Sequence, residues 1–450
     1  MSKPSIPQGT RDFSPGVMAK RKFILSTIES VYKSYGFMPL ETPAMENLST
    51  LTGKYGDEGD QLLFKILNNG DYLKDINLQE VSSKTLTPKI ADRGLRYDLT
   101  VPLARFVVMN RNDISFPFKR YQMQPVWRAD RPQKGRYREF WQCDADVLGT
   151  DSLICEADFI RIYKDVFARL GLHGYELRIN HRRLLEAICI KAGASEHFKT
   201  ITIIIDKTDK IGADGVAREL GELGLGQNAV NTLSQFLTKS ELNTTTLNTL
   251  EAALGDIPEG KKAIDDLRKV IELSGSAIEH VSLDCSLARG LDYYTGCIFE
   301  VVPTTVKMGS ISGGGRYDDL TGVFGMKDIS GIGISFGIDR LFDVMEELQL
   351  FPPAGMLFTD LLFCPMDDKA IAYCIPLADQ LRQAGYKVEI YPSATKLKKQ
   401  LDYANNKGIS WVVVIGEDEM QNGILSVKNM LSGEQTKTES DKIQEVLKEK

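Results

Sequence analysis

The chain has 450 residues, with 55 lysines and arginines against 61 aspartates and glutamates and a net charge of −6. This length predicts two or three domains, and any contact with nucleic acid must depend on local basic patches. The seven cysteines include no CxxC pair, which indicates reduced, mostly buried thiols. We expect a cytoplasmic protein, because no apolar run reaches the roughly 18 residues of a membrane span and the N-terminus lacks the apolar core of a signal peptide.

The first segments predict a helix followed by extended chain. Apolar residues recur at helical spacing over residues 16–35, and Gly36 follows where a helix would end. Residues 37–43, FMPLETP, are held extended by their prolines. Residues 62–67 then predict a short strand or helix.

Three segments alternate with period two, which predicts antiparallel strands with one face over a cleft. They are residues 95–101 (LRYDLTV), 120–128 (RYQMQPVWR) and 138–147 (REFWQCDADV). The last two are joined by ADRPQKGRY, and this arrangement is typical of a hairpin with a long loop.

The rest of the chain alternates between helical and strand-forming regions. We expect a helix at 151–170, a mostly helical insertion at 194–276, strands with glycine at 281–302 and 310–334, a helix at 337–348 and a linker at 351–358. Beyond the linker, a βαβαβ pattern predicts a separate α/β domain with a largely parallel core.

Cations gather around the predicted hairpin. Arg128 ends its first strand, Arg136 lies in its loop and Arg138 begins its second strand. Arginine binds phosphate oxygens bidentately and stays charged, so this group of arginines around the hairpin loop suits a polyphosphate. Phe140, on the same face as Arg138, has the ring to stack on a base. Taken alone, a charged and solvated loop is the simpler interpretation.

Hydrogen-bond acceptors lie on the same inferred face. Asp98, Gln142 and Asp146 would together recognise an ammonium or imidazole group. Taken alone, surface carboxylates on exposed strands are the better interpretation.

The segment LARGLDYYTG, residues 287–296, combines a cation with two tyrosines. Arg289 has the charge to neutralise a phosphate or carboxylate. Tyr293 and Tyr294 point to opposite faces if the chain is extended, so one of them meets a ligand. A turn with aromatic core residues is the alternative.

Two glycine-rich segments follow, SGGGRYDDL and GIGISFGIDRL. Glycine lets the backbone approach a ligand closely. Arg340, in the first turn of the predicted helix, suits a terminal phosphate. Neither segment is a Walker loop, because no GK[ST] follows.

In this order, the motifs resemble those of class II aminoacyl-tRNA synthetases, specifically the histidyl-tRNA synthetase family. Residues 16–43, 126–140 and 331–341 resemble class motifs 1, 2 and 3, while RYDLT, QCDAD and LARGLDYYTG resemble segments specific to the histidine enzymes. The resemblance covers nearly the whole chain.

The resemblance implies an α+β fold, with a six- or seven-stranded antiparallel sheet flanked by helices. Residues 1–193 and 277–350 would form the catalytic core, 194–276 a helical insertion, 351–358 a linker and 359–450 an α/β domain that reads the anticodon. It also implies a homodimer formed through motif 1, which ends at Pro43.

The resemblance also assigns site residues. Those for histidine are Asp98, Leu99, Thr100, Arg128, Gln142, Asp146, Arg289, Tyr293 and Tyr294, and those for ATP are Arg128, Asp130, Arg136, Phe140 and Arg340. Asp146 and Tyr294 would bracket the imidazole, and Arg128 and Arg289 would act as the catalytic cations. Asp98, Thr100 and Gln142 would hold the substrate ammonium, and Phe140 would stack on adenine.

The implied reaction activates L-histidine with ATP to histidyl-adenylate and pyrophosphate, and then transfers histidine to the 3′ end of histidine tRNA. Mg²⁺ is implied as well, although the sequence assigns no ligands to it. One alternative is an inactive regulatory paralogue, such as the partner of ATP phosphoribosyltransferase, but those chains usually lack the anticodon domain and degrade LARGLDYYTG. A ligase for another amino acid is disfavoured by Asp146 and Tyr294.

Replacement of Arg289 tests its assignment as a catalytic cation. We expect Arg289→Ala to lower the rate of histidine activation far more than the affinity for histidine, because the charge would act mainly on the transition state. ATP–pyrophosphate exchange measures the rate. A variant with normal exchange would remove Arg289 from the mechanism.

Overall fold

The computed structural model describes residues 3–54, 56–74, 76–77, 81–288, 294–318, 320–352 and 358–448. They form two compact units, residues 1–351 and 352–450. None of the helices in these ranges has the length and apolar character needed to cross a membrane.

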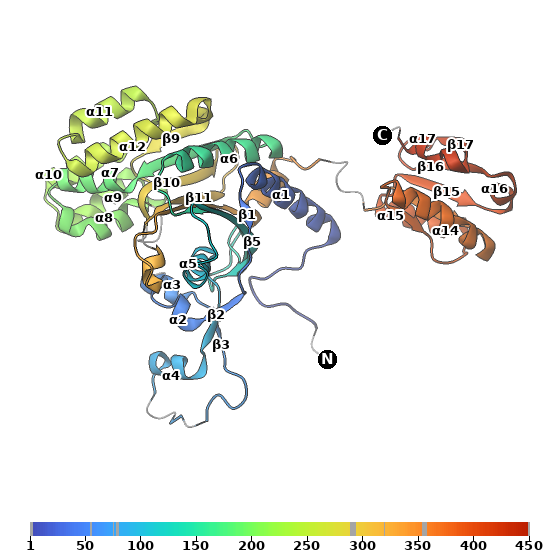
Figure 1. The fold of residues 1–450 in the computed structure, drawn as a ribbon, viewed down its shortest axis with the longest axis horizontal. Helices are drawn as coiled ribbons and strands as arrows, with labels where there is room; N and C mark the ends of the chain where they lie inside the picture. Colours follow the sequence, from blue (N-terminus) through green and yellow to red (C-terminus); the bar gives the residue numbers. More distant parts are fainter. Residues whose placement is uncertain are drawn as a thin grey trace. The chain divides into compact units, whose positions relative to one another are not determined.

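A mostly antiparallel sheet forms the centre of the first unit (Figure 1). In spatial order, its described strands are β1 (Met38–Pro39), β5 (Phe118–Trp127), β6 (Glu139–Leu148), β12 (Gly331–Gly337), β11 (Ser312–Tyr317), β10 (Tyr294–Pro303), β7 (Tyr175–His181), β9 (Val281–Asp284) and β8 (Lys239–Glu241). β1 runs parallel to β5 and β9 runs parallel to β7, while the other neighbours are antiparallel. The predicted hairpin of residues 120–147 is confirmed as β5 and β6.

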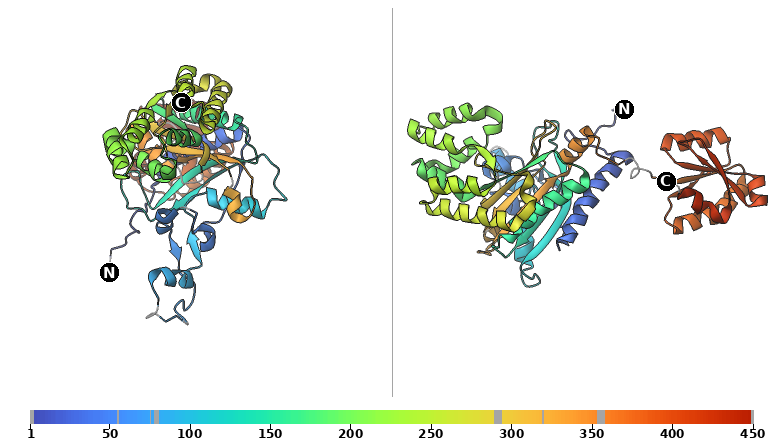
Figure 2. Two further views of the ribbon diagram at one scale, coloured as in Figure 1. Left: turned by 90° about the vertical axis from the view of Figure 1, so that its left-hand side faces the viewer. Right: turned by 90° about the horizontal axis from the view of Figure 1, so that it is seen from above.

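Alternation along β6 gives the sheet one apolar and one polar face. Cys143, Ala145 and Val147 are buried in the main core, together with Ile28 of α1 (Pro15–Ser34) and Phe159 of α6 (Ile154–Leu170). Figures 1 and 2 show α1 and α6 over this face, while α5 (Thr100–Met109) lies on the opposite, concave side. Because the helices cover the apolar face, the polar face is free to form a cleft.

The strand predicted for residues 95–101 is wrong beyond Leu95. β4 (Arg93–Leu95) ends there, and the chain enters α5 at Thr100. Residues 100–109 form a helix because Leu103 and Val107 recur at helical spacing and are fully buried. Pro102 is compatible with this helix, because a proline is tolerated in a first helical turn. The residues before α5 therefore cross the polar face as a loop.

Two further groups of elements belong to the first unit. An appendage that projects from the sheet carries β2 (Met45–Asn47), α2 (Leu48–Leu51), α3 (Gly56–Gln61), β3 (Lys65–Ile66), α4 (Ser83–Ile90) and β4 (Figures 1 and 2). The region predicted as a helical insertion carries η1 (Ser195–His197), α8 (Phe198–Ile205), α9 (Thr208–Glu222), α10 (Gln227–Phe236), α11 (Thr244–Leu254), α12 (Pro258–Ser274) and η2 (Gly275–His280). These helices follow α7 (Arg182–Lys191), and their apolar side chains join the main core. Between β11 and β12 lies η3 (Leu320–Phe324), and α13 (Ile338–Glu347) follows β12.

The second unit is an α/β domain, as its sequence pattern predicts. Its described elements are β13 (Leu361–Pro365), α14 (Asp368–Gln383), β14 (Val388–Ile390), α15 (Leu397–Lys407), β15 (Trp411–Ile415), α16 (Glu417–Asn422), β16 (Ile424–Asn429), β17 (Gln435–Glu439), η5 (Ser440–Lys442) and α17 (Ile443–Leu447). β14, β13 and β15 are parallel, and β16 and β17 extend the sheet as an antiparallel hairpin.

All seven cysteines are buried free thiols. The prediction of reduced, buried cysteines is therefore confirmed. Burial raises the pKa of Cys285 and of Cys364 to about 12, so these thiols are not reactive thiolates.

A buried ion pair joins α6 to β11 behind the polar face. The guanidinium of Arg316 binds Glu156 through both carboxylate oxygens, with Nε–Oε1 at 2.5 Å and Nη2–Oε2 at 2.7 Å. Glu156 is fully buried, and Arg316 also donates to the carbonyl of Thr150 and to the hydroxyl of Ser330. This bidentate pair stabilises the packing of α6 on the sheet.

Loss of the Glu156 charge should therefore weaken the first unit. We expect Glu156→Gln to lower the free energy of unfolding by about 3–5 kcal/mol, because it leaves a buried guanidinium unpaired. The matched control Glu272→Gln breaks an exposed pair with Lys269 and should cost less than about 1 kcal/mol. Urea denaturation measures both, and equal losses would contradict the assigned role.

Candidate active site

A cavity of about 390 Å³ opens on the polar face of the sheet. Ten residues predicted from the sequence line it: Asp98, Thr100, Arg128, Asp130, Arg136, Phe140, Gln142, Asp146, Tyr294 and Arg340. Leu99 is fully buried beside it and is not a lining residue. Arg289 and Tyr293 lie outside the described residues. Elements far apart in sequence thus bring most of the predicted site together.

One end of the cavity is anchored by Asp146 of β6. Its Oδ2 lies 2.7 Å from Nη2 of Arg120, directly across the sheet on β5, and its Oδ1 accepts from the hydroxyl of Tyr317 at 2.5 Å. Both charged side chains are almost entirely buried. Gly333 lies opposite on β12, where an added Cβ would sit 2.0 Å from Oδ1, so only glycine leaves room for this carboxylate.

Tyr294 enters the cavity beside Asp146. It pairs in register with Tyr317 at the start of β10. A Cβ at Gly315 would lie 2.9 Å from the Tyr294 ring, so this glycine makes room for the aromatic side chain. A carboxylate and a tyrosine thereby lie at one end of the cavity.

Asp144 adds a third carboxyl to this end of the site, besides Asp98 and Asp146. Burial raises the pKa of Asp144 to about 7, the positive charge of Arg120 opposes this rise, and the carboxylates of Asp146 and Asp98 add to it. Burial also raises the pKa of Asp146, which Arg120 and Tyr317 oppose. Three carboxyl groups close to a single cation, Arg120, favour a cationic ligand.

The loop before α5 brings Asp98 and Thr100 to the cavity. Oδ1 of Asp98 accepts from the backbone N–H of Val101 at 3.2 Å, which satisfies a donor in the first turn of α5. The carbonyl of Leu99 accepts from Nη2 of Arg120 at 3.3 Å. The loop is therefore bound both to its own helix and to β5.

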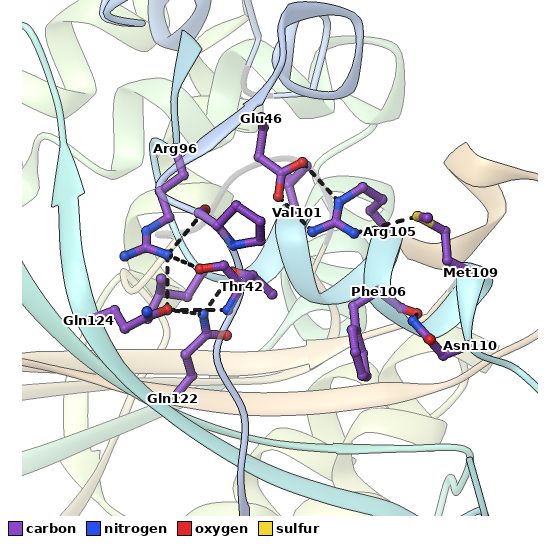
Figure 3. A network of polar contacts seen from close by, with 12 residues as sticks. Thr42, Glu46, Arg96, Val101, Arg105, Phe106, Met109, Asn110, Gln122 and Gln124 are labelled. Carbon is purple, nitrogen blue, oxygen red and sulfur yellow. Dashed lines mark hydrogen bonds and ion pairs between the residues drawn. The ribbon is translucent and has the colours of Figure 1, made fainter. Parts of the chain in front are cut away.

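Arg96 fixes the other side of this loop (Figure 3). Its Nη1 donates to the carbonyl of Thr42 at 2.7 Å and to the side chain of Gln124 at 2.9 Å, and its Nε donates to the carbonyl of Pro125. Gln122 joins the network through Thr42 and Gln124. Arg96 therefore ties the loop to β5 and to the extended segment after α1.

The other end of the cavity is cationic and aromatic. The guanidinium of Arg128 lies 4.2 Å from the ring centre of Tyr97 and 5.1 Å from that of Phe140, and its Nε donates to the carbonyl of Tyr97. Arg136, about half exposed, lies 3.6 Å from Asp130. These cations can contact an anion, and Phe140 has an aromatic face for a planar ring.

Helix α13 supplies Arg340 to this cationic end. Nε of Arg340 donates to the carbonyl of Gly135 at 2.8 Å, and Nη1 donates to the carbonyl of Ser310 at 2.7 Å. The neighbouring Asp339 binds Arg21 of α1 and the N-terminal Arg11, and accepts from the backbone N–H of Trp141. The start of α13 is thus fixed between the hairpin loop, α1 and β6.

Sequence reasoning named ten of the residues that line the cavity but missed part of their support. Arg120 had a signal, because it lies two residues before Gln122 on the face that carries Arg128. Tyr317 lies inside the glycine-rich SGGGRYDDL segment, where no role was predicted for it. Asp339 had no signal, because its charged partners Arg11 and Arg21 come from the distant N-terminal region.

Comparisons with known proteins agree along the whole chain. Residues 82–341 match the model of the histidyl-tRNA synthetase family, and residues 360–450 match the anticodon binding domain. A histidine–tRNA ligase of Cytophaga hutchinsonii is 52% identical over 98% of this chain and 99% of its own length. That of Phocaeicola vulgatus is 51% identical over 99% of both chains.

Solved structures show the same architecture. Histidyl-tRNA synthetase from Nostoc sp. PCC 7120 aligns with a TM-score of 0.86 and 30% identity, covering 100% of this chain and 99% of that one. An ATP phosphoribosyltransferase regulatory subunit/histidyl-tRNA synthetase from Bacillus halodurans aligns with a TM-score of 0.72 at 21% identity, over 92% of this chain and 99% of that one. The second likeness concerns the fold alone.

The raised pKa of Asp144 predicts a pH-dependent stability. Between its ordinary value of 3.8 and about 7, the folded protein retains a proton that the unfolded chain releases, so stability falls as pH rises through this window. Asn cannot ionise, so the melting temperature of ligand-free Asp144→Asn should exceed that of the natural protein by at least about 2 °C more at pH 8 than at pH 5. Exposed Asp256→Asn is the control, and a pH-independent difference for Asp144→Asn would contradict the prediction.

Proposed function

The chain belongs to the histidyl-tRNA synthetase family, and we propose that the cavity on its polar face is where it activates histidine with ATP. The chain catalyses a two-step ligation, in which L-histidine and ATP form histidyl-adenylate and pyrophosphate before histidine is transferred to histidine tRNA. One observation carries the assignment of the site: a single cavity has a carboxylate-rich end and a cationic end that the ring of Phe140 lines.

The carboxylate-rich end suits histidine. Neutral imidazole has one N–H donor and one bare nitrogen, and we assign the N–H to Asp146 and the bare nitrogen to the Tyr294 hydroxyl. Asp98, Thr100 and Gln142 line the cavity where they can hold the ammonium group. A site that pairs both ring nitrogens rejects analogues that leave its polar groups unpaired.

The cationic end suits ATP. Phe140 would stack on adenine with Arg340 on the opposite side near the γ-phosphate, and Arg136 with Asp130 would border the outer phosphates. We assign Arg128 of the cationic end to both the α-phosphate and the histidine carboxylate. That carboxylate attacks the α-phosphorus, a P–O bond to pyrophosphate breaks, and catalysis comes from positioning and charge without a protein nucleophile. We propose, as expected from the sequence, that Arg289 stabilises the α-phosphate and that Tyr293 lies beside histidine.

Mg²⁺ would reach this site with ATP. Across the described residues, no group of three or more His, Cys, Asp or Glu side chains is arranged to hold a metal ion. Mg²⁺ often uses substrate phosphates, waters and one or two carboxylates, and Asp130 is a carboxylate at the phosphate end. The residues therefore fit an ion bound mainly by the nucleotide, where it would neutralise phosphate charge.

We also propose a cytoplasmic homodimer that forms through motif 1. Met38, within the extended part of this motif, and Met45, just after it, are each about half exposed and would be covered in a dimer. We propose that residues 359–450 read the anticodon and that residues 194–276 form the helical insertion. The catalytic core would comprise residues 1–193 and 277–350, and residues 351–358 would form the linker. Lys398 and Lys399 of α15 are exposed and are available for RNA phosphates.

The direct test of function is ATP–pyrophosphate exchange with each amino acid in turn. We expect exchange only with histidine, because the cavity pairs both imidazole nitrogens. Absence of histidine-dependent exchange would refute the assignment.

Replacement of Phe140 tests the adenine site. A base stacked on an aromatic ring gains about 1–3 kcal/mol, so Phe140→Leu should raise the KM for ATP about tenfold while the KM for histidine stays nearly constant. Phe358→Leu changes an exposed phenylalanine that does not line the cavity, and should alter neither KM. An unchanged KM for ATP in Phe140→Leu would place adenine elsewhere.

A further inference from the structure

Arg120 is a fully buried arginine whose charge lies directly behind the carboxylate-rich end of the cavity. Its Nη2 contacts Oδ2 of Asp146 at 2.7 Å and the carbonyl of Leu99 at 3.3 Å. Its Nε and Nη1 have no hydrogen-bond partner among the described residues. Burying a guanidinium with an incomplete set of partners is costly, so a purely structural role accounts poorly for this residue.

We propose that Arg120 is a positioning residue that sets the selectivity for histidine by holding Asp146 ionised and oriented toward the imidazole N–H. This inference rests on the proposed function of the cavity. Arg120 does not line the cavity and acts through the residues that do.

The first reason is the protonation state of Asp146. Burial favours a neutral carboxylic acid, which carries a proton and loses part of its capacity to accept. The positive charge of Arg120 favours the carboxylate, and the hydroxyl of Tyr317 donates to Oδ1. Arg120 and Tyr317 occupy two of about four acceptor positions on a carboxylate, which leaves room for an imidazole N–H.

The second reason is the position of Leu99 between Asp98 and Thr100. The same nitrogen of Arg120 binds the Leu99 carbonyl and Asp146. Arg120 therefore connects the loop assigned to the ammonium group with the carboxylate assigned to the imidazole. One guanidinium fixes the separation of the two groups that must fit the ends of one histidine molecule.

The third reason is the local balance of charge. Asp98, Asp144 and Asp146 are all buried, and Arg120 is the cation that opposes the raised pKa of both Asp144 and Asp146. The other polar neighbours of these carboxyls are uncharged: Ser335 of β12 contacts Asp144, and Tyr317 of β11 contacts Asp146. Loss of Arg120 should thus protonate this end of the cavity, which removes the acceptor that distinguishes histidine.

The test compares histidine with thiazolylalanine, whose ring has a bare nitrogen but no N–H, in ATP–pyrophosphate exchange. For Arg120→Met we expect the KM for histidine to rise about 100-fold, the KM for ATP to stay within about threefold, and the preference for histidine over thiazolylalanine to fall at least tenfold. Arg120→Lys should recover part of the preference, because it keeps the charge without the planar pair of donors. Arg178→Met removes an arginine from β7 of the same sheet, away from the cavity, and should leave the preference unchanged.

A double variant keeps the test decisive if Arg120→Met does not fold. Arg120→Met/Asp146→Asn removes both charges, so it should fold and show the same preference as Asp146→Asn alone, since the effect of Arg120 on the preference between the two rings passes through Asp146. A further loss of preference in the double variant would overturn the proposal, as would a folded Arg120→Met that still discriminates like the natural protein. Failure of the natural protein to use histidine would instead refute the proposed function.

Discussion

The arrangement of the site depends on the free-energy cost of burying charged side chains on one face of the sheet. A buried carboxylate is stable only when a cation or several donors pair with it. Asp146 meets this condition through Arg120 and Tyr317, and Asp339 meets it through Arg21 and Arg11. The pair of Arg120 and Asp146 joins the two strands of one hairpin, while the contacts of Tyr317, Arg21 and Arg11 join elements that are distant in sequence. The stability of the charges and the shape of the cavity therefore depend on the same contacts.

The two ends of the cavity differ because their charges have different degrees of burial. At the carboxylate-rich end, Asp144 and Asp146 are buried and crowd around Arg120, so the pocket attracts a small ligand with N–H donors. At the other end, Arg136 is about half exposed and Arg128 lies between two aromatic rings, so both remain available to an anion. This polarity matches a reaction that joins an amino acid with an ammonium group and an imidazole N–H to a nucleotide.

The sequence predicted the hairpin of β5 and β6 because a strand that packs one face against helices alternates apolar and polar side chains along its length. The same reasoning failed for residues 95–101, where the pattern was too short to distinguish a strand from a loop leading into α5. Asp98 and Thr100 nevertheless reach the cavity, since the loop crosses the face that the strand was expected to form. The buried partners Arg120, Tyr317 and Asp339 carry no recognisable spacing among themselves, so their contacts emerge only when β5, β6, β11 and α13 are brought together. The resemblance to a known family supplied the roles that alternation alone left open.

The most direct measurement is a crystal structure of the protein with L-histidine and a non-hydrolysable ATP analogue. Our account predicts the imidazole N–H at Asp146, the other ring nitrogen at the Tyr294 hydroxyl, adenine on Phe140, and Arg128 between the histidine carboxylate and the α-phosphate. An imidazole that makes no contact with Asp146, or an adenine away from Phe140, would contradict the account.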